Sequence, residues 1–162
     1  MLTGNSTRWL VIAAALLVAL GVLFYPTDEK RVREAAEAIV SAANAGPGEL
    51  ARALDTYARR DVSIDVTELA EPLRGRDAIV AAVGQASQLG QHLHFRIEGV
   101  EISIEGNRAR VSADLITTLR AEVPELRRPR HSTARFEKHD GKFRLVSAEI
   151  GAERLDQPEA RP

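Results

Sequence analysis

The beginning of the chain carries an unbroken apolar run. From Trp9 to Tyr25 all seventeen residues are apolar or glycine, and no charge interrupts them. As an α-helix, this run and the two residues after it would be roughly 28 Å long, about the thickness of the hydrocarbon core of a bilayer. Trp9 and Tyr25, at its two ends, carry side chains that favour the membrane interfaces. The pattern predicts a transmembrane helix over residues 9–25, preceded by a short tail over residues 1–8.

Two alternatives to this anchor stay open. A cleaved signal peptide would share the apolar run and the preceding Arg8, and Ala19-Leu20-Gly21 has small residues at the spacing of a cleavage site. The run continues beyond that site to Tyr25, which favours an uncleaved anchor. A buried helix of a globular domain fits less well, because such helices seldom are apolar on every side.

Charges beside the run give conflicting indications of its orientation. Arg8 precedes it, whereas Lys30, Arg31 and Arg33 come after it, and the positive-inside rule would keep the domain after the run in the cytoplasm. A short tail before a first hydrophobic segment instead resembles a bacterial signal-anchor, which exports the domain on its C-terminal side. Nineteen arginines against three lysines in an alanine-rich chain are typical of high-GC bacteria. We therefore expect a single-pass protein of the bacterial inner membrane, its domain on the periplasmic side and the bilayer its partner through residues 9–25.

Beyond the apolar run, the pattern predicts helices first and strands afterwards. Apolar residues at helical spacing predict three helices, at residues 28–43, 49–58 and 77–83. Thr27 is suited to cap the first of them. Alternation with a period of two predicts strands at residues 62–66, 93–97, 100–104, 109–119, 132–138 and 142–149. The stretch between the fourth and fifth of these, with the basic cluster Arg127-Arg128-Pro129-Arg130, is predicted as a loop, and residues 151–162 as a disordered tail.

This order predicts an α+β domain, in which about three helices pack on one face of a curved, mostly antiparallel sheet. The composition narrows the functions that such a domain can have. A net charge of −1 disfavours nucleic acid as a partner, and the absence of cysteine excludes disulfides, thiolate metal sites and cysteine nucleophiles. No phosphate-binding loop, dinucleotide fingerprint or hydrolase motif is present, so we expect no cofactor.

Two segments carry a resemblance to a known family. The strand Asp61-Val62-Ser63-Ile64-Asp65-Val66, followed by Gly75-Arg76-Asp77-Ala78-Ile79, resembles the nuclear transport factor 2-like superfamily, as does Gly141-Lys142-Phe143 at the start of the last strand. The similarity covers about residues 28–150. This superfamily includes SnoaL-like polyketide cyclases and ketosteroid isomerases. The resemblance implies a cone with a pocket between helices and sheet, and homodimers formed through the sheet.

The resemblance also points to candidate catalytic residues. Isomerase-like relatives project a carboxylate base into the cone from the first strand, and an ungapped count places that position at Val66, which cannot accept a proton. Asp65 is adjacent, but its side chain is expected on the opposite face unless a bulge re-aims it. Tyr57 and Asp114 are the other weak catalytic candidates. Tyr57, Val66 and Asp114 are the residues that we expect to line the pocket.

His92 and His94 form the one pattern that suggests a metal. Two histidines separated by one residue share a strand face and can bind one ion, for which Asp114 or His131 would have to supply a further ligand. Arg96 on the same face would repel a cation. We therefore expect no metal, and interpret both histidines as residues of a solvated strand face.

The sequence supports two functional hypotheses from different classes. The first is a membrane-tethered, non-enzymatic cone domain that binds a partner protein or a small apolar ligand at the cell envelope, as bacterial envelope assembly factors do. The second is a SnoaL-like enzyme of isomerase, cyclase or dehydratase type, which acts on a small hydrophobic substrate by acid–base chemistry. An enzyme requires at least two ionisable groups that converge in the cone.

Overall fold

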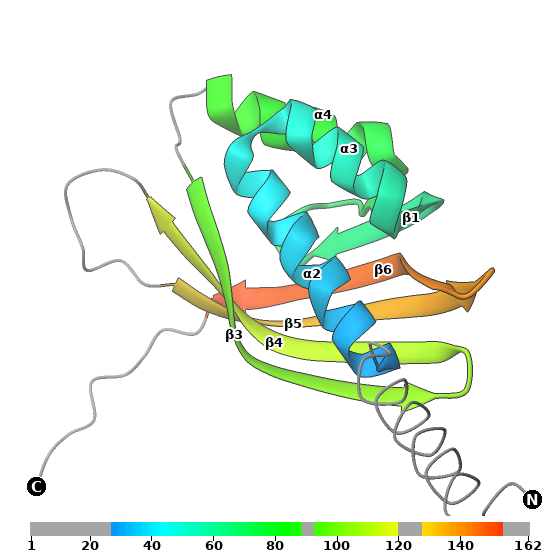
Figure 1. Cartoon of the computed structure of the whole chain (residues 1–162). Coiled ribbons are helices and arrows are strands. Elements are labelled where there is room, and N and C mark those ends of the chain that lie inside the picture. Colours follow the sequence, from blue (N-terminus) through cyan, green and yellow to red (C-terminus); the bar gives the residue numbers. More distant parts are fainter. Residues whose placement is uncertain (1–26, 89–92, 120–127, 154–162) are drawn as a thin grey trace, which may run out of the picture.

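A computed structural model describes residues 27–88, 93–119 and 128–153. Its helices are α2 (Asp28–Ala45), α3 (Pro47–Tyr57) and α4 (Arg76–Gln88). Its strands are β1 (Ala58–Val66), β2 (Leu73–Arg74), β3 (Leu93–Glu105), β4 (Arg108–Leu119), β5 (Arg128–His139) and β6 (Lys142–Glu153). The strands form one sheet in the order β2-β1-β6-β5-β4-β3, and the three helices lie on one face of it (Figure 1). The predicted α+β domain is confirmed.

The first two helices begin and end at local sequence signals. The Oγ1 atom of Thr27 accepts a hydrogen bond from the Lys30 amide at 3.3 Å, as expected for the N-cap. Gly46 separates α2 from α3 with a φ of +121°, and Pro47 occupies the first turn of α3, where its missing amide hydrogen is not needed. The second helix was predicted to start at Glu49. It starts two residues earlier because proline suits a first turn.

The sheet is antiparallel except for the pairing of β1 with β6, which is parallel. Residues 93–97 and 100–104, predicted as two strands, form the single strand β3. A register shift between Glu98 and Glu101 bends this strand, and Gly99 has a φ of +61° there. Such a bulge needs a residue that tolerates positive φ, and glycine does so without steric cost.

Several boundaries also differ from the sequence prediction. Leu73 and Arg74 pair with β1 as the short strand β2, which was not among the predicted strands. The strand β5 begins at Arg128, so most of the basic cluster belongs to the sheet. The last strand β6 continues to Glu153, which pairs with Arg130, so the first three residues of the predicted tail are strand. The other residues of that tail lie outside the described part of the chain.

The core lies between the helices and the sheet. Val32 of α2, Leu54 of α3, Val62 of β1 and Phe136 of β5 are almost completely buried. Ile79 of α4 is also buried. Contacts between apolar side chains thus hold all three helices against the sheet.

The predicted transmembrane helix cannot be compared with the structure. Residues 9–25, with Trp9 and Tyr25, lie outside the described residues. None of the helices within residues 27–88, 93–119 and 128–153 has the length and hydropathy to cross a membrane.

Candidate functional site

The pairing of the strands assigns each side chain to one of two faces of the sheet. Ala109 and Val111 of β4 belong to the core cluster, so the residues that alternate with them point to the opposite side, which we call the outer face. The helices cover the other, inner face (Figure 1). A group that acts in the cone has to lie on the inner face.

Asp65 and Val66 lie on opposite faces of β1, as the alternation predicted. Val66 is half-buried and shares the inner face with Val62, whereas Asp65 is exposed. Both residues pair with β6 in regular register, opposite Ile150 and Glu149 respectively. No bulge at this end of β1 turns the Asp65 carboxylate towards the cone.

Asp114 lies on the outer face, whereas the sequence predicted that it would line the pocket. It is opposite His131 on β5, and the carboxylate and imidazole approach to 3.6 Å. Two strands separate β4 from β1, so Asp114 and Asp65 are at least about 14 Å apart at the usual strand spacing. The two carboxylates therefore cannot act on one substrate atom.

Tyr57 is the last residue of α3, and its side chain packs against the core cluster. It is half-buried there. This position agrees with a tyrosine whose ring completes the core, and it lies on the helix side of the sheet, away from the Asp114–His131 pair.

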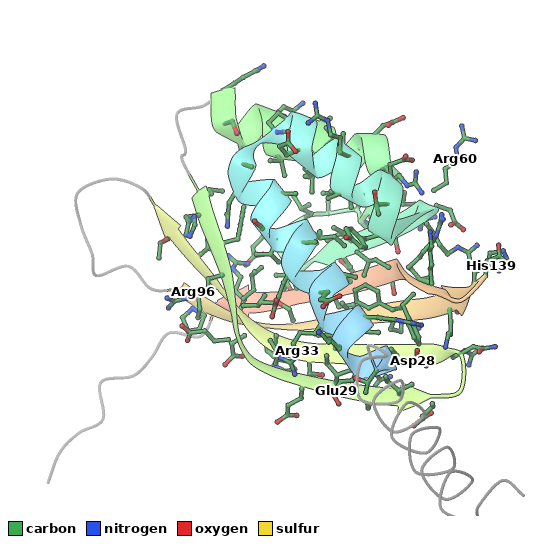
Figure 2. The ribbon with its side chains drawn as sticks, viewed as in Figure 1. Asp28, Glu29, Arg33, Arg60, Arg96 and His139 are labelled. Carbon is green, nitrogen blue, oxygen red and sulfur yellow. The ribbon has the colours of Figure 1, made fainter. Side chains whose placement is uncertain are left out.

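The histidine pair is only partly described. His92 lies outside the described residues, and His94 is exposed on the outer face of β3. His94 is opposite Thr118 of β4, four residues along that strand from Asp114, or about 13 Å. Arg96, labelled in Figure 2, projects from the sheet. Its place on β3 is between them on the same face, and it pairs with Glu98. Among the described residues no three metal-binding side chains converge.

The inner face holds an apolar surface that the core does not use. Its residues are half-buried and absent from the core cluster, and we call them the apolar end: Val66, Phe95, Ile97, Leu115 and Ile150. They come from four strands, and the register places Val66 opposite Ile150 and Ile97 opposite Leu115. This surface is suited to an apolar ligand.

One ion pair borders the apolar end. Arg130, opposite Leu115, donates a hydrogen bond to Glu68, with 2.6 Å between Nη1 and Oε1. Only 17% of the Arg130 side chain is exposed. The hydrogen bond from the Arg130 guanidinium lowers the pKa of Glu68 below its ordinary value. This ion pair was not predicted from the sequence, because Arg130 was expected in a loop and lies in β5.

The edge strand beside the apolar end is held by a side chain. The amide of Asn44, near the end of α2, accepts a hydrogen bond from the Phe95 amide and donates one to the Phe95 carbonyl, both at 2.7 Å. Since β3 is the outermost strand, these backbone groups have no neighbouring strand to pair with. The contact fixes β3 against α2.

Together these features define an α+β cone domain with an apolar inner surface and its ionisable side chains mostly outside. Within that class, the chain belongs to the SnoaL-like domain family, whose model matches residues 26–149. This confirms the superfamily that the sequence resembled. No curated protein matches the chain.

Several solved structures share the fold. An NTF2-like protein with a cystatin-like fold from Novosphingobium aromaticivorans is 20% identical, with a TM-score of 0.69, and the match covers 90% of this chain and 91% of that one. A protein of unknown function from Mycobacterium tuberculosis is 13% identical, with a TM-score of 0.65 and coverage of 95% and 78%. A candidate dehydratase of the NTF2-like family from Streptomyces avermitilis is 18% identical, with a TM-score of 0.60 and coverage of 78% and 96%. At these identities the likeness establishes the fold alone.

Proposed function

We propose that this chain is a membrane-tethered, non-catalytic binding domain, which holds a small apolar ligand or an apolar segment of a partner protein at the cell envelope. One observation carries the proposal: the groups suited to acid–base chemistry do not converge on the apolar end. Asp65 and Asp114 lie on the outer face. The ungapped count from the family resemblance assigns the isomerases' base position to Val66, which cannot accept a proton.

General acid–base catalysis requires a group within hydrogen-bond reach of the proton that it transfers. The ionisable side chains described beside the apolar end are Arg130 and Glu68, and their charges are engaged with each other. Apolar side chains from four strands provide a surface for binding, but no proton acceptor.

The tether rests on the sequence. The apolar run of residues 9–25 ends two residues before Thr27, which caps α2. So short a connection would keep the domain close to the bilayer. Holding a domain at a membrane raises its effective concentration towards membrane-bound partners, without any new contact.

The proposal can be tested by complementation of a strain that lacks the gene. Asp65→Asn and Asp114→Asn remove a proton acceptor and preserve shape, and we expect both variants to restore the function of the protein. Ile97→Gln places an amide in the apolar end, and we expect it to fail. Glu98→Gln, the next residue on the opposite face, is its matched control and should succeed. Circular dichroism of each purified variant establishes that it is folded.

The competing hypothesis is a SnoaL-like enzyme with a small hydrophobic substrate. The candidate dehydratase with the same fold motivates it. A folded, membrane-bound Asp65→Asn or Asp114→Asn protein that fails to complement, together with an active Ile97→Gln protein, would favour the enzyme and contradict the binding domain.

A further inference from the structure

The outer face of the sheet contains a groove that the proposed function does not use. It lies towards the β3–β4 turn and has a volume of about 480 Å³, within the range of small-molecule sites. Six polar residues contribute to its lining, and we call it the outer groove: Ser103, Glu105, Arg108, Arg110, Arg135 and Glu137. We propose that the outer groove binds the anionic group, a phosphate or a carboxylate, of a small polar molecule.

Two arginines face each other across the groove. Arg110 of β4 is directly opposite Arg135 of β5. Side chains in this relation start about 5 Å apart, and like charges there destabilise the strand pair. In the part of the chain that the structure describes, the Arg110 guanidinium makes no hydrogen bond or ion pair. An anion between the two guanidinium groups would turn this repulsion into attraction.

The pair of Arg110 and Arg135 differs from the next set of residues that lie opposite one another across the sheet. There Arg108 lies between Glu105 and Glu137, and Glu137 lies between Arg108 and Arg144, so signs alternate across four strands. Such alternation stabilises a sheet without any ligand. Arg110 and Arg135 have no such alternation of charge, so we place the anion between these two arginines.

Hydroxyl groups flank the two arginines. The same row places Ser103 beside Arg110 and Ser147 beside Arg135. The Nε of Arg135 donates a hydrogen bond of 2.9 Å to the Oγ of Ser147, which is 8% exposed. This bond orients the guanidinium before a ligand arrives. The planar fork of arginine matches the oxygens of a carboxylate or a phosphate.

The remaining charges limit the ligand. Three guanidinium groups and two carboxylates line the groove, so their net charge is one positive. A polyanion such as a nucleic acid strand would meet Glu105 and Glu137. A small molecule with one anionic group avoids that repulsion, and its hydroxyl or amino groups can donate hydrogen bonds to these carboxylates.

A second copy of the chain is the competing occupant of this face. Dimers through the sheet, which the family resemblance implies, would cover the outer groove. Homodimer interfaces are usually apolar at their centre. The exposed large hydrophobic residue within the described ranges is Leu69, which comes after β1 and lies outside the groove. The charged lining therefore favours a small anion.

The test measures binding of inorganic phosphate to the full-length protein in a non-ionic detergent. We expect saturable shifts of the backbone amides around Arg110 and Arg135 in NMR spectra, and a rise in Tm. Arg110→Gln should weaken phosphate binding about tenfold or more, since hydrogen bonds to charged groups contribute that much. Arg135→Lys keeps the charge and loses the fork, and should also weaken binding. Arg60→Gln, the same change at an exposed arginine of β1 outside the groove, is the matched control and should bind as wild type.

Three results would overturn the proposal. One is an equal effect of phosphate on the wild type and on Arg110→Gln. Another is an equal effect of sodium chloride at the same ionic strength, which would indicate screening of surface charge. The third is a dimer, seen by sedimentation, that dissociates when Arg110 is replaced and does not bind phosphate. Vesicles with anionic lipids that bind the protein through Arg110, in the absence of any effect of free phosphate, would identify a lipid headgroup as the source of the anion.

Discussion

At the scale of single residues, a shift of one position decides what chemistry β1 can provide. Val66 has the inner position and no proton acceptor, while Asp65 has the carboxylate and the outer position. Alternation along a strand makes this an all-or-none difference, because neighbouring side chains point to opposite faces. The same rule places Asp114 outside, since it alternates with the buried Val111 and Ala113.

The ion pair of Glu68 with Arg130 gives a prediction about pH. Because the pKa of Glu68 is lowered in the folded protein, its ionised form stabilises the fold above the unfolded value of about 4.5. That contribution is lost as the pH falls through the lower, folded value. We expect Glu68→Gln to lower Tm at neutral pH, by a small amount because the carboxylate is solvated.

The difference in Tm between Glu68→Gln and wild type should then disappear in acid. A series of melting curves between neutral and strongly acidic pH measures this difference. Glu71→Gln, the same substitution at an exposed position nearby, is the control and should match wild type throughout. A Tm difference that persists unchanged in acid would show that the ionisation of Glu68 is not responsible.

At the scale of elements, local signals in the sequence predicted most of the helices and strands. Thr27 and Gly46 mark the two ends of α2, and the alternation from Ala109 to Leu119 predicted β4 almost in full. Contacts between distant residues were not predictable in this way. Asn44 holds Phe95 across 51 positions of sequence, and Arg130 pairs with Glu68 across 62.

Docking of α3 on the sheet should depend on Leu54. Its side chain is fully buried, so Leu54→Ala removes apolar contacts and leaves a cavity, at a cost of about 2–5 kcal/mol. Leu69→Ala makes the same change at a residue that is 44% exposed, and should cost less than about 0.5 kcal/mol. Urea unfolding of both variants measures the two free energies. Equal losses would mean that α3 does not pack as the structure shows.

At the scale of the whole molecule, the fold was easier to predict than the site. The fold depends on the order of many apolar positions, such as Val62, Ile64 and Val66, so a misplaced boundary changes little. A site depends on which few side chains meet. The opposed guanidinium groups of Arg110 and Arg135 result from the register of β4 with β5, which the sequence of either strand alone does not specify.

The membrane anchor is the last prediction. Burial of the apolar run of residues 9–25 in a bilayer is strongly favourable, so we expect the full-length protein to stay with membranes after washing with high salt or carbonate. Replacing Leu16 and Leu17 by arginine places two charges near the centre of the predicted span, at a cost of about 2.5–3.5 kcal/mol each, and should release the protein.

Deleting residues 1–25 should likewise give a free domain with an unchanged Tm, because the cap at Thr27 and the core residues from Val32 onward remain. If tethering matters for function, this folded domain should fail in the complementation assay, in which Asp65→Asn and Asp114→Asn succeed. Protein recovered outside the membranes, with a new N-terminus near residue 22, would instead show that the apolar run is a cleaved signal peptide. The binding domain would then have to find its partners by diffusion, without the gain in effective concentration that an anchor provides.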